Sequence, residues 1–217
     1  MGLWWKENQE LLKKERYLIL EFFPELSFSE VDNTIFVHGE LYIDAIMDSY
    51  EIEIKIPDNY PKSIPILREI GGEIPRHLDR HINQNGTCCV CVKPAERIHW
   101  PIGSSIIDFI KNLVIPFLLN QYHYDACGRW IAGDYSHGDR GVLEFYAEQL
   151  QVNNPLKVLK ILKEVKKAII NQSKKCPCLS GKTIKKCHLK NISSLKKIID
   201  QDILCENYNS LQKLIYR

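Results

Sequence analysis

Residues 50–56 read Tyr-Glu-Ile-Glu-Ile-Lys-Ile, and this stretch decides the fold class. Ile52, Ile54 and Ile56 alternate with charged residues, so in an extended chain they share one face while the charges occupy the other. Residues 34–43 show the same alternation around apolar side chains. The pattern predicts two neighbouring strands of an antiparallel sheet that buries one face and leaves the other in water.

Turn and strand signals continue on both sides of this pair. We expect a hairpin connection at residues 44–49, a turn at residues 57–61 and a further strand at residues 64–70. Gly39 lies inside the first alternating stretch and predicts a β-bulge there. These elements together predict an antiparallel meander.

The other periodic segments are helical. The spacing of apolar residues among charged ones predicts an amphipathic helix over residues 3–22. The helix is expected to end there, because Pro24 disfavours helix in the residue before it. Apolar side chains spaced three and four apart predict further helices over residues 104–119, 139–152 and 155–172, with one or two more within residues 192–215. The order of helix, meander and helices predicts an α+β domain with a helical C-terminal extension.

The charge distribution divides the 217-residue chain. Residues 1–150 hold 14 Lys and Arg against 23 Asp and Glu, whereas residues 151–217 hold 15 against 4. This asymmetry predicts a domain over residues 1–152 and a basic extension over residues 153–217 that binds an acidic protein or a nucleic acid. A solvated basic helix face explains the same lysines without a partner.

The distribution of apolar residues argues against a membrane protein. No apolar run approaches the ~20 residues of a spanning helix, and the N-terminus has no apolar core of a signal peptide. We therefore expect a cytoplasmic protein that has no membrane partner. In a reducing cytosol, its eight cysteines favour catalysis or metal binding over disulfides.

Residues 71–101 are rich in Gly, Pro, His and Asn, and so long a loop in a compact domain is usually functional. The loop contains Cys88, Cys89 and Cys91. A thiolate flanked by imidazole and amide groups is a candidate nucleophile, and an Asn N–H is a candidate oxyanion donor. Buried structural cysteines and a metal cluster explain the same residues, so the three interpretations stay open on chemistry alone.

Four segments give the chain a resemblance to the ubiquitin-conjugating enzymes. They are the strand at residues 50–57, the turn Tyr60-Pro61-Lys62-Ser63-Ile64-Pro65, the element His81-x-Asn83, and the stretch Asn85-Gly86-Thr87-Cys88-Cys89-Val90. That family shows a strand, a Tyr-Pro-x-x-x-Pro turn, a His-Pro-Asn element and then Asn-Gly-x-x-Cys. The resemblance covers about residues 1–150 and implies the ubiquitin-conjugating fold.

The resemblance also implies a mechanism. Cys89 stands three residues after the glycine, where the family has its nucleophile, and would hold an acyl group as a thioester before a lysine attacks it. Asn83 matches the asparagine that stabilises the oxyanion, and His81 matches a mainly structural histidine. The interval from His81 to Cys89 is shorter than usual, and Ile82 replaces the family's proline.

Three further features are similar to the bacterial branch of the family. They are Asp79-Arg80-His81-Ile82-Asn83, Trp100 and Gly133-Asp134-Tyr135-Ser136-His137-Gly138-x-x-Gly141. This branch includes the conjugating enzymes of short type II CBASS anti-phage operons. The likeness implies that the acyl donor is the C-terminus of a cGAS/DncV-like nucleotidyltransferase and that a lysine of another protein is the acceptor.

Three residues are secondary candidates. Asp79 is a candidate to help the incoming lysine lose its proton, and Cys91 is a candidate for an oxidative switch with Cys89, although a Cys-x-Cys disulfide is strained. His137 is a candidate for the active site or for capping the helix at residues 139–152. Packing explains each of them without catalysis.

A second cysteine group lies at residues 173–190. Cys176, Cys178, Cys187 and His188 offer three thiolates and an imidazole, which suit a closed tetrahedral Zn²⁺ site. The segment resembles the SEC-C motif, with Leu179 in place of its first glycine. We therefore expect a structural zinc knuckle, which is too small to fold without metal.

Two other functions are compatible with the sequence. The domain could be a non-catalytic adaptor of the same fold, or a thiol redox protein that uses Cys89 and Cys91. An intact cysteine at the family's position favours the acyl-transfer hypothesis.

Overall fold

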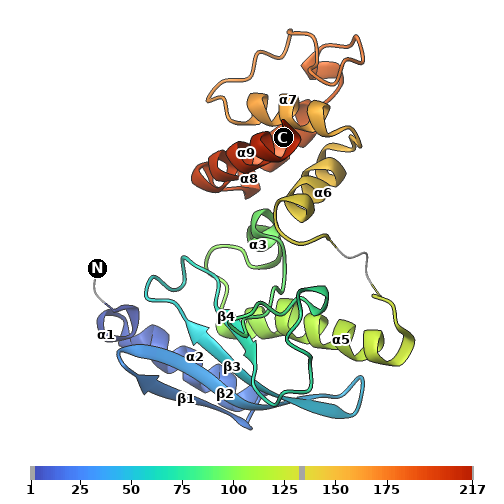
Figure 1. Cartoon of the computed structure of the whole chain (residues 1–217). Helices are drawn as coiled ribbons and strands as arrows, with labels where there is room; N and C mark the ends of the chain where they lie inside the picture. The colour runs from blue at the N-terminus through green and yellow to red at the C-terminus, as the bar shows by residue number, and fades with distance from the viewer. Residues whose placement is uncertain (1–2, 132–134, 217) are drawn as a thin grey trace. The chain divides into compact units, whose positions relative to one another are not determined.

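The computed structural model of the chain describes residues 3–131 and 135–216. The chain forms two units, Met1–Cys91 with His99–Gly133 and Val92–Ile98 with Asp134–Arg217. This division differs from the boundary expected after residue 152, because the helix that precedes that boundary packs with the C-terminal helices. Figure 1 shows the elements of both units along the chain.

The first unit is built on a four-stranded antiparallel sheet. Its strands are β1 (Leu26–Val31), β2 (Thr34–Ile43), β3 (Asp48–Ile56) and β4 (Ile66–Glu69), and they lie in sequence order. The alternating segments at residues 34–43 and 50–56 are therefore strands, as predicted. β1 was not predicted from the sequence; Asp32 and Asn33, both at positive φ, turn the chain from β1 into β2.

The alternation of side chains across the sheet makes the core of this unit. Ile52, Ile54 and Ile56 of β3 are fully buried, and Val37 pairs with Ile54 across β2 and β3. Glu51 on the opposite face is exposed. The sheet thus buries one face against the helices of the unit and leaves the other in water, as expected of an antiparallel sheet.

Gly39 does not form the predicted bulge. The register between β2 and β3 runs without interruption from Ile35↔Ile56 to Ile43↔Asp48. A glycine is required for another reason, because a Cβ at position 39 would lie 2.2 Å from the carbonyl oxygen of Glu25. The residue also has a φ of +138°, which L-residues rarely adopt.

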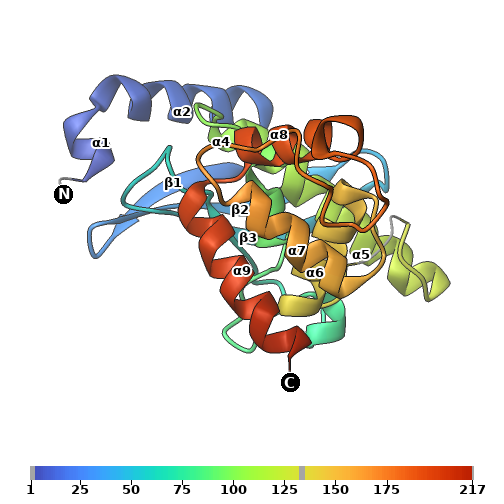
Figure 2. The same ribbon diagram turned by 90° about the horizontal axis from the view of Figure 1, so that it is seen from above.

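The helices of the first unit differ in their bounds from the expected segments. They are α1 (Trp4–Glu7), α2 (Gln9–Phe22), α4 (Ile106–Phe109), a π-helical turn (Ile110–Val114) and α5 (Ile115–Cys127). Asn8 divides the expected helix at residues 3–22, because its side chain accepts the N–H of Leu11 and caps α2. α2 contacts both β1 and α4 (Figures 1 and 2).

The second unit is helical. It contains α6 (Asp139–Leu150), α7 (Pro155–Val165), α8 (Leu189–Ile198) and α9 (Gln201–Ile215), and α9 contacts both α6 and α7 (Figure 2). α7 ends at Val165, seven residues before the expected end at 172. Ile169, which lies within the expected helix, is 85% exposed.

Three short helices lie in the connection between β4 and α4. They are the 3₁₀ turns η1 (Leu78–Arg80) and η2 (Lys93–Ala95) and the short helix α3 (Glu96–His99). The segment at residues 71–101 is thus not structureless, although its turns are too short to give a periodic pattern. Among the described residues, no helix has the length and apolar character needed to cross a bilayer.

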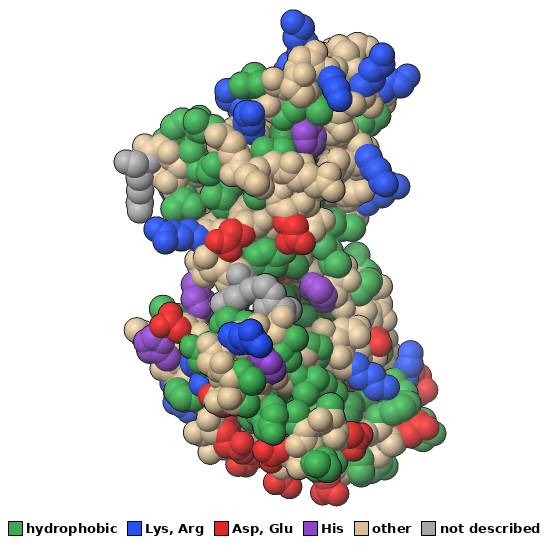
Figure 3. All heavy atoms as spheres, turned by 90° about the vertical axis from the view of Figure 1, so that its right-hand side faces the viewer, with side chains coloured by type: hydrophobic (Ala, Val, Ile, Leu, Met, Phe, Trp, Pro, Cys, Tyr) green, Lys and Arg blue, Asp and Glu red, His purple; other side chains and the backbone are tan. Residues whose placement is uncertain are grey.

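The opposite charges of the two parts of the chain are visible on the surface. Acidic side chains gather on the face of the sheet unit seen in Figure 3, whereas Lys and Arg stand out on the face of the helical unit. This follows the excess of 23 acidic over 14 basic residues before residue 151 and of 15 basic over 4 acidic residues after residue 150.

A buried carboxyl group joins α2, the turn after β3 and α4. Glu15 is 1% exposed, and its Oε1 accepts the hydroxyl of Tyr60 at 2.6 Å. Its Oε2 accepts the backbone N–H of Ile106, at the start of α4, at 3.0 Å. Burial raises the pKa of Glu15, although these two hydrogen bonds act in the opposite direction.

The raised pKa of Glu15 gives a pH dependence of stability. The unfolded carboxyl ionises near pKa about 4.3, whereas the folded one keeps its proton to higher pH, so the free energy of unfolding falls as the pH rises from the unfolded toward the folded pKa. Glu15→Gln should remove this fall. The new amide can still accept the N–H of Ile106 and donate to Tyr60, whose hydroxyl can turn to the carbonyl of Ser104, 3.5 Å away.

Urea unfolding from pH 4 to pH 8 measures this effect. Glu10→Gln is the matched control, because Glu10 lies on the same helix with an exposed side chain and a surface ion pair to Lys13. The expectation is wrong if the Glu15→Gln profile has the same pH dependence as that of the unsubstituted protein.

Candidate active-site loop and candidate metal centre

The cysteine segment of the long loop continues the sheet beyond β4. Thr87 forms a bridge with Arg68 of β4, and the N–H of Cys88 donates to the carbonyl of Leu67 at 2.9 Å. The next N–H, that of Cys89, donates to the carbonyl of His81 on the other side at 2.7 Å. The segment is therefore held by backbone hydrogen bonds on both sides, and successive side chains point to opposite faces.

This alternation separates Cys88 from Cys89. Cys88 is 9% exposed in the core, and burial raises the pKa of its thiol to about 12. Cys89 is only partly buried, and its Sγ lies 3.9 Å from the backbone carbonyl of Cys91. Because the thiolate is the reactive form, Cys88 is a poor nucleophile, and Cys89 is the better candidate of the two.

Asn83 lies close in sequence to Cys89, but its amide is engaged within its own turn. The Nδ2 of Asn83 donates to the carbonyl and the hydroxyl oxygen of Thr87 at 3.1 and 3.0 Å. The hydroxyl of Thr87 in turn donates to the side chain of Asn85 at 2.7 Å. To stabilise an oxyanion, the Asn83 amide would have to leave Thr87.

Arg80 anchors the loop, and sequence reasoning did not assign it this role. Its guanidinium donates to both carboxylate oxygens of Asp125 at 2.7 and 2.9 Å and to the side chain of Gln121 at 2.8 Å. Gln121 returns a hydrogen bond to the backbone carbonyl of Arg80 at 2.9 Å. Both partners lie on α5, more than 40 residues along the chain, so no local pattern could have paired them.

A series of aromatic contacts connects Arg80 to His81. The guanidinium of Arg80 lies 4.9 Å from the ring centre of Tyr124, which stacks on Trp130 at 4.4 Å. His81 meets Trp130 edge-on at 5.4 Å and has a left-handed backbone with φ of +55°. Because the carbonyl of His81 accepts the N–H of Cys89, the anchor on α5 positions the cysteine backbone.

Asp79 and Cys91 are the remaining candidates of the loop. Asp79 has an 80% exposed side chain beside His77, with 3.3 Å between its Oδ2 and the Nδ1 of His77. Cys91 packs partly buried against the core of the first unit. No described hydrogen bond or ion pair joins Asp79 to Cys89.

The residues on either side of His137 lie at the start of α6. Gly138, rather than His137, is the N-cap residue of α6, and the N–H and hydroxyl of Ser136 donate to the carboxylate of Glu144. A Cβ on Gly141 would lie 1.9 Å from the carbonyl oxygen of Ser136, so this position requires glycine. Gly133 and Asp134 lie outside the described residues.

The second cysteine group converges on one point. Nδ1 of His188 lies 3.2 Å from Sγ of Cys176 and 3.1 Å from Sγ of Cys187, and the sulfurs of Cys178 and Cys187 are 3.5 Å apart. All four ligand atoms lie within 4.8 Å of one another. Cys176, Cys178, Cys187 and His188 could therefore hold a metal ion together.

The thiols of this group differ in their pKa values. Burial raises the pKa of Cys176 to about 12. Burial also acts to raise the pKa of Cys178, but hydrogen bonds from Ser180, Cys176 and Cys187 together outweigh it and lower that pKa to about 7. A bound cation favours the thiolate form of the three cysteines, so metal binding would release protons.

Contacts around the cysteine group tie it to α6. The Nε2 of His188 lies 3.1 Å from the carbonyl of Leu150, and the amide of Asn191 donates to the carbonyl of Gln149 at 2.8 Å. These are end carbonyls of α6, which have no partner within the helix. The same contact leaves Nδ1 of His188 as the ligand atom and supports its ring from behind.

The chain that follows Cys91 also belongs to the second unit. Ala95 is 3% exposed in the core that contains Cys176 and Cys178, and Val92 packs against that core. The Nε of Arg97 lies 3.3 Å from a carboxylate oxygen of Asp200. Three residues beyond Cys89, the chain therefore packs with the core that contains Cys176 and Cys178.

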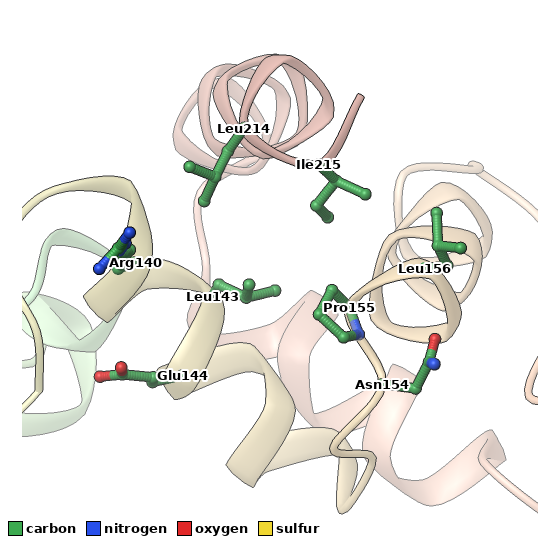
Figure 4. A pocket seen from close by; sticks show the side chains of 8 residues that line it. All are labelled: Arg140, Leu143, Glu144, Asn154, Pro155, Leu156, Leu214 and Ile215. Atoms are coloured by element: carbon green, nitrogen blue, oxygen red, sulfur yellow. The ribbon is translucent and has the colours of Figure 1, made fainter. Parts of the chain in front are cut away.

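A groove in the second unit does not involve either cysteine group. Figure 4 shows it between α6, the start of α7 and the end of α9, with a volume of about 550 Å³ and Arg140 and Glu144 among its lining residues. Its apolar lining consists of Leu143, Pro155, Leu156, Leu214 and Ile215. Glu144 is already bonded to Ser136, so the groove offers few polar groups for a ligand.

Comparison of the chain with protein families, curated proteins and solved structures finds no match in any of the three. The site is therefore interpreted from its own residues.

Arg80→Lys tests the anchor of the loop. The shorter ammonium keeps the charge but cannot make the paired bonds to Asp125 or the bond to Gln121, so we expect a loss of about 1–3 kcal/mol in the free energy of unfolding. Arg129→Lys, at an exposed position, is the control and should cost less than about 0.5 kcal/mol. Urea unfolding measures both, and equal stabilities would contradict the anchoring role.

Metal removal tests the link between the ligand group and residues 92–98. Without the ion, the three thiol groups and His188 lose their common partner, so amide hydrogen exchange should become faster in residues 92–98 and at the end of α6. The comparison is between metal-loaded protein and protein treated with a chelator. Amides of β3 are the internal control, and unchanged exchange at residues 92–98 would contradict the link.

Proposed function

We propose that this protein is a ubiquitin-conjugating-like acyl carrier that forms a thioester at Cys89 with a protein C-terminus and passes it to a lysine. The observation that carries the proposal is the separation of the two adjacent cysteines. Backbone pairing buries Cys88 and leaves Cys89 partly accessible, and Cys89 is the residue that matches the family's nucleophile. The α+β order of the first unit, with a helix before a four-stranded antiparallel meander, supports a ubiquitin-conjugating fold.

The proposed chemistry has two steps. The thiolate of Cys89 attacks an activated C-terminal carbonyl carbon, a C–S bond forms, and the activating group leaves with the electrons of its bond. The ε-amine of a lysine then attacks the thioester, a C–N bond forms, and Cys89 leaves as thiolate while the ammonium proton passes to water. Dividing one acyl transfer in this way replaces a difficult step by two easier ones.

The surroundings of Cys89 define what the protein contributes. The anchored loop fixes the cysteine backbone, so the main contribution is the positioning of the reactants. Asn83 could stabilise the oxyanion once its amide leaves Thr87, 3.0–3.1 Å away. Asp79, which is exposed beside His77, would serve the proton transfer only if a bound acceptor brought its lysine there.

Zinc is the metal proposed for the second cysteine group. Zn–S bonds of about 2.3 Å and Zn–N bonds of about 2.0–2.1 Å in a tetrahedron place neighbouring ligand atoms about 3.5–3.8 Å apart. The separations of 3.1, 3.2 and 3.5 Å in the structure are close to this spacing. With four protein ligands and no open position, the ion would be structural and would stabilise the knuckle, in agreement with the SEC-C resemblance.

The proposed partners follow from the resemblance and from the charge. The acyl donor would be the C-terminus of a cGAS/DncV-like nucleotidyltransferase in an anti-phage system of the CBASS type, and the acceptor would be a lysine of another protein in the bacterial cytoplasm. The excess of 15 basic over 4 acidic residues beyond residue 150 supports a further partner that is a nucleic acid or an acidic protein.

Replacement of Cys89 tests the proposal. With the nucleotidyltransferase and its operon co-expressed, the unsubstituted protein should form a covalent adduct that thiol reductant releases, and Cys89→Ala should abolish it. Cys89→Ser should form an oxygen ester that resists the reductant but is cleaved by alkali. Denaturing electrophoresis and intact mass spectrometry identify the adducts.

Two control variants separate the alternatives. Cys88→Ala should keep the adduct, because Cys88 is buried, and Cys91→Ala should keep it unless these cysteines serve redox chemistry. An adduct that persists in Cys89→Ala contradicts the proposal. Binding of the nucleotidyltransferase without any adduct favours a non-catalytic adaptor, and dependence on both Cys89 and Cys91 under oxidant favours a thiol redox protein.

A further inference from the structure

The knuckle brings lysines from two segments to one place. Lys175 forms a backbone bridge with Thr183, the N–H of Cys176 donates to the carbonyl of Lys182 at 2.8 Å, and the N–H of Ile184 donates to the carbonyl of Lys174 at 2.9 Å. Two antiparallel segments thus lie side by side, and Lys185 and Lys186 follow directly on the second. The candidate metal ligands lie next to these segments along the chain: Cys176 and Cys178 at the end of the first, and Cys187 and His188 beyond the second.

Within the described part of the chain, only one lysine of the knuckle has an ion pair with an acidic side chain. Residues 173–190 contain six lysines and neither Asp nor Glu. Lys174 binds the buried carboxylate of Glu164 at 2.9 Å, which ties the knuckle to α7. For Lys175, Lys182, Lys185 and Lys186, no acidic side chain of the described residues lies within ion-pair distance, and all four are exposed.

The metal centre removes little of this positive charge. Three thiolates around a divalent cation carry a net charge of −1, and the imidazole adds none. Lys175, Lys182, Lys185 and Lys186 therefore leave a positive surface on the paired segments, with or without a bound ion. Figure 3 shows Lys and Arg side chains on the visible face of this unit with few acidic side chains among them.

The kind of partner follows from what accompanies the lysines. Protein interfaces depend on aromatic or Arg anchors in desolvated pockets and are depleted in Lys, and residues 173–190 contain no aromatic residue and no Arg. Contacts to phosphates need only positive charge. The segment also has no Asn or Gln to read base edges, so recognition would not depend on base sequence.

We infer that the lysine surface formed by Lys175, Lys182, Lys185 and Lys186 binds the phosphate backbone of nucleic acid without sequence specificity. This activity is separate from thioester chemistry at Cys89. It gives the basic extension a function of its own, which is to bring the protein to nucleic acid while the metal keeps the two lysine segments paired.

Binding of a fluorescently labelled DNA duplex of mixed sequence, measured by anisotropy across a salt series, tests this inference. The full-length, metal-loaded protein should bind with an affinity that falls steeply with salt. The triple variant Lys182→Gln, Lys185→Gln, Lys186→Gln should bind about tenfold more weakly or worse, and its slope of log K against log salt should be smaller by about 2–3, since each lost phosphate contact removes about 0.9.

A matched triple variant, Lys160→Gln, Lys163→Gln, Lys197→Gln, removes the same charge from exposed positions outside the knuckle. It should change the affinity by about twofold or less, because these lysines lie outside the paired segments that carry the proposed phosphate contacts. Metal content and amide exchange check that both variants fold. Equal losses in the two variants, a duplex affinity that does not depend on salt, or tighter binding of polyglutamate than of the duplex would each overturn the inference.

Cys89→Ala protein should bind the duplex as the unsubstituted protein does. This arm keeps the test independent of the proposed acyl transfer, since failure of adduct formation leaves the binding result unchanged. A loss of duplex binding in Cys89→Ala would contradict the separation of the two activities.

Discussion

The alternation of side chains across the antiparallel sheet is the constraint on which the first unit depends. It buries the isoleucines of β3 against the helices and leaves the charged residues between them in water. The cysteine segment pairs with β4, because the carbonyl of Leu67 accepts the N–H of Cys88. Its side chains therefore alternate between the two faces in the same way. Cys88 therefore enters the core and Cys89 does not. The alternation of side chains that forms the buried face of the sheet thus also decides which of the two adjacent cysteines stays accessible.

In the second unit, Cys176, Cys178, Cys187 and His188 form a group that could hold a metal ion. His188 contacts the carbonyl of Leu150 at the end of α6, and Ala95, which follows the cysteine loop along the chain, is buried in the same core as Cys176 and Cys178. The basic C-terminal part is thus not a loose tail. It is a folded unit whose core includes a segment only three residues beyond Cys89.

The eight cysteines illustrate how their surroundings decide the chemistry of one residue type. Burial raises the pKa of Cys88 to about 12 and makes it a poor nucleophile. Cys89, on the opposite face of the same segment, has the access that a nucleophile needs. Cys176, Cys178 and Cys187 converge with an imidazole and have the geometry of ligands. Cys127 and Cys205 have no functional explanation in the structure.

The sequence by itself determined the α+β class, the strands β2 and β3 and the four metal-ligand candidates, because alternation and ligand spacing are local patterns. It missed β1, placed a bulge at Gly39 where a close carbonyl requires glycine, and extended α7 to residue 172. Only the tertiary structure paired Arg80 with Gln121 and Asp125, engaged the amide of Asn83 with Thr87 and joined α6 to the metal ligands. These contacts join residues through turns and packing, and packing between distant segments leaves no periodic signal in the sequence.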